Sequence, residues 1–166
     1  MTITNKPKSF WLTVLFLAWM IPAMSQHVPV IQFDQLNKRI HQNNDTLYVV
    51  NFWATWCGPC VTELPLLESV HKKFANQKVK VLLVSLDFKR DLQTKVIPFV
   101  QKRKLRSSVY LLNETDHNTW IDKISPEWSG SIPATLFIKT SRNVRKFMEK
   151  EVKAGELETI IQSFHL

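Results

Sequence analysis

Trp53-Ala-Thr-Trp-Cys-Gly-Pro-Cys60 contains both cysteines of the chain, three positions apart. An apolar run rich in β-branched residues (46–52) precedes this segment, and apolar residues recur at helical spacing in the segment that follows it (61–74). The first pattern is typical of a strand buried on both faces, and the second of a helix packed along one side. The sequence therefore predicts a strand, a tight turn and a helix whose first turn carries Cys-x-x-Cys.

The spacing of the two cysteines suits reversible disulfide chemistry. Residues three apart in the first turn of a helix lie on one face, so Cys57 and Cys60 can bond or separate with little movement of the backbone. The unpaired N–H groups and the dipole of a helix N-terminus favour a thiolate at Cys57, whereas Cys60 is expected to be shielded and to act second. Pro59 is tolerated in a first turn, and Gly58 lets another chain approach the sulfur.

Two other uses of Cys-x-x-Cys are less well supported by the sequence. A zinc site needs two further ligands, but the chain has no third cysteine and its five histidines are scattered without a His-x-x-x-His pair. A purely structural disulfide across so short a loop would constrain the unfolded chain little. Trp56, beside the first cysteine, either offers a flat surface to a partner chain or caps the core.

The longer segment Asn51-Phe-Trp-Ala-Thr-Trp-Cys-Gly-Pro-Cys60 resembles the active-site segment of the thioredoxin superfamily, and more narrowly that of the extracytoplasmic TlpA/ResA-type thiol–disulfide oxidoreductases. The resemblance extends over 45–165 and is looser outside the cysteine motif. It implies an α/β thioredoxin fold with a central mixed β-sheet flanked by helices, and the TlpA/ResA-type strand–helix insertion at 89–112. It also implies a redox enzyme in which the Cys57–Cys60 pair carries the electrons, without a bound cofactor or metal.

The same resemblance assigns roles to residues outside the motif. Ile132-Pro133 resembles the family's cis-proline loop, in which the proline shapes the substrate groove and the preceding residue offers its backbone to the substrate chain. The alternative is an ordinary proline at the start of a strand. Glu63 matches an acidic residue implicated in proton handling near the buried cysteine, and it could accept the Cys60 proton. Alternatively, Glu63 faces solvent and complements the helix dipole.

Two positions depart from the pattern of thioredoxins. Asn51 stands in place of an aspartate, and because an amide cannot take up a proton, Glu63 becomes the leading proton acceptor. Ser131 stands where a glycine usually precedes the Ile-Pro pair, which leaves the shape of the groove, and therefore the partner, open. Trp120 and Trp128 either line that groove or belong to the core.

Alternating periodicities predict the remaining elements. We expect a short strand and a helix within 28–44, with Asp34 as the helix N-cap, and a kink in the active-site helix at Pro65. The expected strands are 46–53, 79–86, 108–112, 134–140 and 144–152, the last two forming a hairpin, and the expected helices are 58–75, 91–104 and 155–164, with a helical turn at 119–124. This order indicates an α/β layer fold.

The first 25 residues have the features of a targeting segment. Lys6 and Lys8 form a positive n-region, 10–21 is apolar but shorter than the roughly 20 residues of a membrane span, and small residues allow cleavage after Ser25. The alternative is an uncleaved signal anchor, with a membrane tether through 10–21. The sequence thus predicts a signal peptide or anchor (1–25) and one thioredoxin-like domain (26–166) in an extracytoplasmic, periplasmic location.

The chain is basic, with 22 Lys and Arg against 14 Asp and Glu, but these residues are spread out and no nucleic-acid motif accompanies them. We therefore expect no nucleic-acid partner. The combined features predict an exported protein-disulfide reductase that acts on protein thiols and disulfides, with a membrane electron donor, and cytochrome c maturation is the first family role to consider. A disulfide-forming oxidase or isomerase and a non-catalytic peptide-binding module are the alternatives. A peroxidase is disfavoured because no Thr-x-x-Cys is present.

Overall fold

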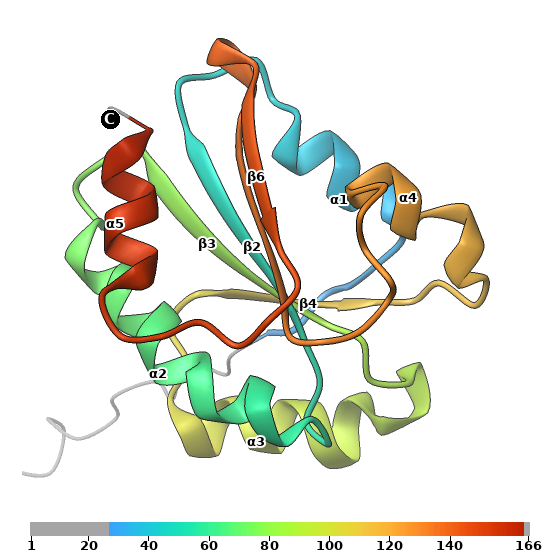
Figure 1. Cartoon of the computed structure of the whole chain (residues 1–166). Helices are drawn as coiled ribbons and strands as arrows, with labels where there is room; N and C mark the ends of the chain where they lie inside the picture. The colour runs from blue at the N-terminus through green and yellow to red at the C-terminus, as the bar shows by residue number, and fades with distance from the viewer. Residues whose placement is uncertain (1–26, 165–166) are drawn as a thin grey trace, which may run out of the picture.

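The computed structural model describes residues 27–164, so the predicted targeting segment (1–25) lies outside the described residues (Figure 1). The strands are β1 (Val30–Ile31), β2 (Leu47–Trp53), β3 (Val79–Ser85), β4 (Ser108–Leu112), β5 (Ala134–Lys139) and β6 (Val144–Met148). The α-helices are α1 (Phe33–Ile40), α2 (Gly58–Lys73), α3 (Ile97–Arg103), α4 (Ile121–Ile124) and α5 (Glu156–Ser163). These elements include each strand and helix that the sequence predicts for 28–164, with differences at some boundaries.

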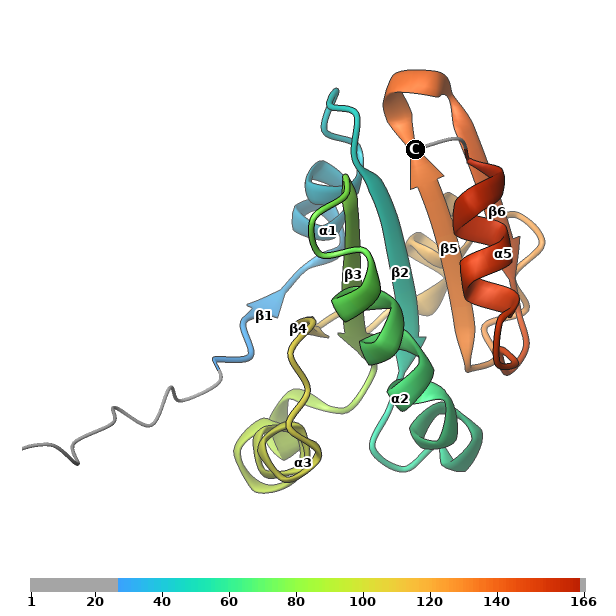
Figure 2. The ribbon, with the colours of Figure 1, turned by 90° about the vertical axis from the view of Figure 1, so that its left-hand side faces the viewer.

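The strands form one six-stranded sheet in the order β1-β4-β3-β2-β5-β6, and Figure 2 shows them in this order from one edge to the other. β1, β4, β3 and β2 pair in parallel, whereas β5 pairs antiparallel with both β2 and β6. The sheet is therefore mixed, and α3 with β4 forms the predicted strand–helix insertion. This is the thioredoxin-like architecture that the resemblance implies.

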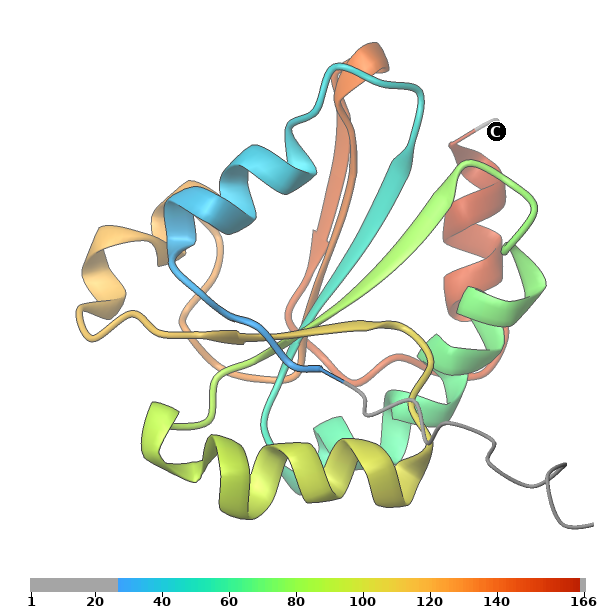
Figure 3. The same ribbon diagram turned by 180° about the vertical axis from the view of Figure 1, so that it is seen from behind.

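Strand β2 lies at the centre of this sheet, and every one of its residues is buried. Because side chains alternate along a strand, Val49 packs into the cluster that includes residues of α2, α3 and α5, while Val50 and Phe52 pack into the cluster with α1 and α4. Figures 1 and 3 show α2 and α5 on one side of the sheet and α1 and α4 on the other. The near-continuous apolar run in the sequence follows from this double coverage.

The insertion between β3 and β4 differs from the single helix predicted at 91–104. A 3₁₀ turn (Lys89–Asp91) and a π-helical turn (Leu92–Val96) come first, and α3 begins at Ile97. Pro98 explains the change, because it has no N–H for the carbonyl of the preceding turn and its ring crowds that carbonyl.

The first helix begins earlier than predicted. Helix α1 starts at Phe33 with Gln32 as its N-cap, so the prediction of Asp34 as the cap is wrong. The Gln32 backbone N–H donates to the Gln35 side chain at 2.9 Å, which closes the end of the helix. Asp34 lies in the first turn, where a carboxylate complements the helix dipole.

The last strand is shorter than the predicted 144–152, because β6 ends at Met148. The Glu149 carboxylate accepts the Ser131 backbone N–H at 3.0 Å, and the Val152 N–H donates to Glu63 at 2.7 Å. Contacts with the loop before β5 and with the Glu63 side chain of α2 thus replace strand pairing for 149–152.

A buried lysine is neutralised at the end of the sheet opposite the cysteines. The Lys139 side chain is 1% exposed and its Nζ lies 2.9 Å from Asp45 Oδ1, while Lys78 Nζ lies 3.1 Å from Asp45 Oδ2. The Lys139 ammonium, and then the hydrogen-bonded Lys78 ammonium, lowers the pKa of Asp45 to about 2. The ionised carboxylate therefore stabilises the fold above its ordinary pKa of 3.8, and this contribution is lost as the pH falls through about 2.

We expect Asp45→Asn to lower the midpoint of thermal unfolding at neutral pH, because the buried Lys139 ammonium loses its counter-charge. The difference from the wild type should shrink as the pH falls from about 4 to about 2. Circular dichroism melts across this pH range measure both effects. Lys139→Met is the control, since it removes the buried charge: the double variant should melt at a higher temperature than Asp45→Asn alone. A double variant that melts no higher would contradict this explanation.

Candidate active site

The turn after β2 places the two cysteines at the start of α2. Cys57 is the N-cap of this helix, and the Cys60 backbone N–H donates to Cys57 Sγ at 3.2 Å. The two sulfurs are joined in a disulfide, with the Cα atoms 5.3 Å apart. Cys57 is 6% exposed and Cys60 is 0% exposed, so Cys57 is the more accessible of the two cysteines. This difference is consistent with the predicted order, in which Cys57 acts first and Cys60 second.

The residues around Cys57 leave its surroundings open. Gly58 and Pro59 are exposed in the first turn of α2, and a Cβ placed on Gly58 would meet no atom within 4 Å. Trp56 is 66% exposed. The alternative in which Trp56 caps the core is therefore wrong, and its flat surface is available to a partner chain.

Asp87, two residues after β3, holds the turn between β2 and α2 in place. Its carboxylate accepts hydrogen bonds from the Thr55 N–H at 2.9 Å, the Thr55 hydroxyl at 2.5 Å and the Ser85 hydroxyl at 2.7 Å. Because β2 and β3 are parallel and Trp53 is opposite Ser85, residues 55 and 87 both lie just beyond the carboxyl ends of these two strands. No role was predicted for Asp87 from the sequence, although a carboxylate shortly after a buried strand is a signal that points to it.

The loop before β5 lies against the disulfide. The Ile132–Pro133 peptide bond is cis, and Cys57 Sγ lies 3.8 Å from the carbonyl oxygen of Ile132. The register explains this proximity, since Ala134 at the start of β5 is opposite Phe52 near the end of β2. Folding thus brings together the cysteines and the two loop residues singled out in the sequence, which are about 75 positions away.

Glu63 is fully buried on α2, one turn after Cys60. Its Oε1 accepts a hydrogen bond from Asn51 Nδ2 at 2.6 Å and its Oε2 accepts one from the Val152 N–H at 2.7 Å. The alternative in which Glu63 faces solvent is therefore wrong. Burial raises the pKa of Glu63 above its ordinary value, even though the hydrogen bonds from Val152 and Asn51 act in the opposite direction.

Asn51 connects three elements at this point. Its Nδ2 donates to Glu63 on α2 and also to Thr135 Oγ1 on β5, at 3.0 Å. Its Oδ1 is buried without a hydrogen-bond partner among the described residues. The amide that replaces the aspartate of thioredoxins therefore holds a carboxylate in place, and the titratable group is Glu63.

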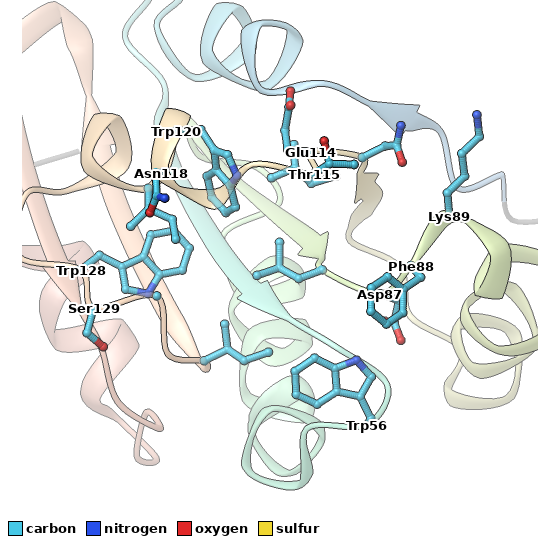
Figure 4. Close-up of a pocket in the computed structure, with 16 residues that line it drawn as sticks. Trp56, Asp87, Phe88, Lys89, Glu114, Thr115, Asn118, Trp120, Trp128 and Ser129 are labelled. Atoms are coloured by element: carbon cyan, nitrogen blue, oxygen red, sulfur yellow. The ribbon is translucent and has the colours of Figure 1, made fainter.

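A cavity of about 600 Å³ opens beside the cysteines, with Trp56 and Ile132 among its lining residues. Figure 4 shows Trp56 and Phe88 on one side of it and Trp120 and Trp128 on the other. Trp120 and Trp128 are buried and their rings lie 5.3 Å apart, so both alternatives hold for them: they belong to the core and they line the groove. Phe88 is an exposed aromatic residue for which the sequence predicted no role, and the Arg90 guanidinium lies 4.7 Å from the centroid of its ring.

Within residues 27–164, no group of three or more His, Cys, Asp or Glu side chains is arranged to hold a metal ion. In the same part of the chain, no helix combines the length and the apolar character needed to cross a membrane.

A Cys-x-x-Cys disulfide at the carboxyl end of the central strand in such a mixed sheet is the arrangement of the thioredoxin superfamily, and this chain has it. Residues 25–147 match the model of the AhpC/TSA family, so the chain belongs to the AhpC/TSA family.

Two curated relatives share much of the chain. The chain is similar to thiol-disulfide oxidoreductase ResA of Oceanobacillus iheyensis, with 26% identity over 78% of this chain and 67% of the relative. It is also similar to thiol-disulfide oxidoreductase ResA of Bacillus cereus, with 29% identity over 68% of this chain and 60% of the relative. Since the match spans only 60% to 67% of these relatives, their substrates and partners enter below as proposals.

Among solved structures, the thioredoxin-related protein of Neisseria meningitidis serogroup B is similar to this chain with a TM-score of 0.63 and 20% identity, covering 74% of this chain and 87% of that one. At this identity the likeness shows the fold, which is thioredoxin-like.

Proposed function

We propose that the protein is an exported thiol–disulfide oxidoreductase that reduces disulfide bonds in polypeptide substrates. The observation that carries this proposal is the Cys57–Cys60 disulfide, in which Cys57 is 6% exposed and Cys60 is fully buried. An exposed Trp56 and the cavity beside Ile132 supply more surface than a small disulfide would use. The substrate class that fits is therefore a protein.

The reduced form would start the reaction. The Cys60 backbone N–H points at Cys57 Sγ and stabilises negative charge there. The Cys57 thiolate attacks one sulfur of the substrate disulfide, a sulfur–sulfur bond forms between enzyme and substrate, and the substrate's second sulfur leaves as a thiolate. The carbonyl of Ile132, 3.8 Å from the reacting sulfur, belongs to the backbone that would pair with the substrate chain.

Cys60 would complete the reaction. Its thiol gives up a proton, for which Glu63 is the proposed acceptor, and the resulting thiolate attacks Cys57 Sγ. The mixed disulfide breaks, the substrate sulfur that was bonded to Cys57 leaves as a thiolate, and the Cys57–Cys60 disulfide is formed. Two electrons have passed to the substrate, so a donor outside the chain must return the enzyme to its dithiol form.

The location and the donor are part of the same proposal. Lys6, Lys8 and the apolar segment 10–21 support export to an extracytoplasmic, periplasmic compartment, with cleavage or with retention as an anchor. An oxidising compartment does not regenerate dithiols, which implies a membrane electron donor. ResA-type similarity makes cytochrome c maturation the first process in which to look for the substrate.

The redox potential decides between this proposal and a disulfide-forming oxidase, because Cys57 and Cys60 could also pass electrons the other way. The purified protein is equilibrated with defined thiol and disulfide buffers, and the cysteines are then alkylated and counted by mass spectrometry. We expect a potential near about −270 mV, the reducing end of the thioredoxin scale. A value near about −120 mV would instead make disulfide formation the function.

A further inference from the structure

The Glu149 carboxylate holds the loop that precedes the cis Ile132–Pro133 peptide bond. Glu149, directly after β6, accepts the backbone N–H of Ser129 at 3.0 Å and that of Ser131 at 3.0 Å. The Ser129 hydroxyl also donates to this carboxylate, and the two serine hydroxyls lie 3.1 Å apart. Three donors of the segment 129–131 thus converge on one side chain.

The rest of the loop leaves little freedom around this contact. Trp128 Nε1 donates to the Ser131 carbonyl at 2.8 Å, so a hydrogen bond between two residues of the loop also holds it in place. Gly130 has φ +93°, and a Cβ at this position would lie 3.3 Å from Ile121 Cδ1, so the backbone passes close to α4. Glu149 holds the loop on the side that faces β6.

We propose that Glu149 is a positioning residue that holds 129–131 so that the Ile132 backbone is presented to the substrate chain beside Cys57. The inference rests on the proposed function. It also rests on the chain connection between the loop and the site, because Ser131 is bonded to Ile132 and the Ile132 carbonyl lies 3.8 Å from Cys57 Sγ. Ser129 and Ile132 also line the cavity next to the cysteines. Ser131, the departure from the thioredoxin pattern, supplies one of the donors that Glu149 accepts.

The charge of Glu149 supports this role. Desolvation raises its pKa, but the hydrogen bonds from Ser129 and Ser131 outweigh that effect and the net pKa lies below the ordinary value. The group is therefore ionised at neutral pH, and hydrogen bonds to an ionised acceptor are the stronger ones. Among the hydrogen bonds of the described residues, none joins Glu149 to either cysteine, so its effect should fall on substrate binding and leave the sulfur chemistry unchanged.

Glu149→Gln tests the proposal, because an amide keeps the size of the side chain but replaces one acceptor with a donor. With insulin as the protein substrate, we expect KM to rise about five- to tenfold while kcat changes by less than about twofold. Reduction of the small disulfide dithiobis(nitrobenzoate) and the Cys57–Cys60 potential should both stay as in the wild type. Circular dichroism confirms that the variant is folded.

Glu127→Gln is the matched control, since it makes the same change of charge on an exposed residue near the same loop, and KM should not change. Ser129→Ala removes one donor without touching the carboxylate, and it should raise KM by a smaller factor in the same direction. An unchanged KM in Glu149→Gln overturns the proposal, as does a shifted potential with loss of activity on both substrates. A wild type inactive on both substrates would instead contradict the proposed function.

Discussion

Replacing Cys57 with serine is expected to abolish disulfide reduction, lowering kcat/KM on insulin by about three orders of magnitude or more. A serine hydroxyl does not ionise near neutral pH and cannot form the mixed disulfide on which the reaction depends. Cys60 cannot take over, because it is fully buried one turn further along α2. Insulin precipitation in the presence of dithiothreitol measures the loss.

Cys60→Ser is the matched control for this prediction. It keeps the reachable sulfur and removes the resolving one, so we expect the variant to accumulate as a covalent complex with its substrate, which mass spectrometry detects. Full activity of Cys57→Ser would contradict the proposed mechanism. If Cys57→Ser lost reductase activity but retained the protein's function in the cell, the peptide-binding alternative would replace the enzyme.

The parts of the structure that were predictable from sequence are those in which local pattern and burial coincide. The run at 46–52 is apolar at consecutive positions because β2 is covered on both faces, and the spacing of apolar residues after Cys60 follows the buried side of α2. Pro98 shows the limit of this method. The apolar period of 91–104 is helical, but a missing backbone N–H changes the type of helix within it.

The parts that were missed depend on contacts between distant segments. Asp87 reaches Thr55 across 32 positions, and Val152 reaches Glu63 across 89 positions. No local pattern predicts that 149–152 passes over the start of α2, so the sequence alone could not decide whether Glu63 is buried. Glu149 was missed for the same reason, because its partners at 129–131 precede β5 and come next to it only through the pairing of Thr135 with Met148 in the β5–β6 hairpin.

Replacing Glu63 with glutamine is expected to stabilise the fold at pH values above the raised pKa of the Glu63 carboxyl group and to slow the resolving step. Because burial raises the pKa of Glu63, the folded state holds this proton more tightly than the unfolded state does. The free energy of unfolding of the wild type therefore falls as the pH rises from the ordinary pKa of 4.5 to the raised one. The glutamine variant lacks this fall, and above the raised pKa its melting temperature should be higher by roughly 2–5 °C.

The surroundings of Glu63 can accept the amide. Asn51 Oδ1 has no partner among the described residues, so rotation of the Asn51 amide would let this oxygen accept from the new glutamine and from the Thr135 hydroxyl. Glutamine can still accept the Val152 N–H that now bonds to Glu63. The substitution therefore removes a buried charge, and the glutamine side chain still has hydrogen-bond partners in Asn51 and Val152.

The kinetic half of this prediction separates stability from function. Glutamine cannot accept the Cys60 proton, so resolution of the mixed disulfide should slow by about 10- to 100-fold and lose the rise with pH that follows ionisation of Glu63. Stopped-flow measurements and melts between about pH 5 and about pH 9 test both effects, with Glu127→Gln as the control for a lost surface charge. An unchanged resolving rate would exclude Glu63 as the proton acceptor. A variant that is more stable but slower would mean that the buried carboxylate destabilises the fold and is retained for the proton it takes from Cys60.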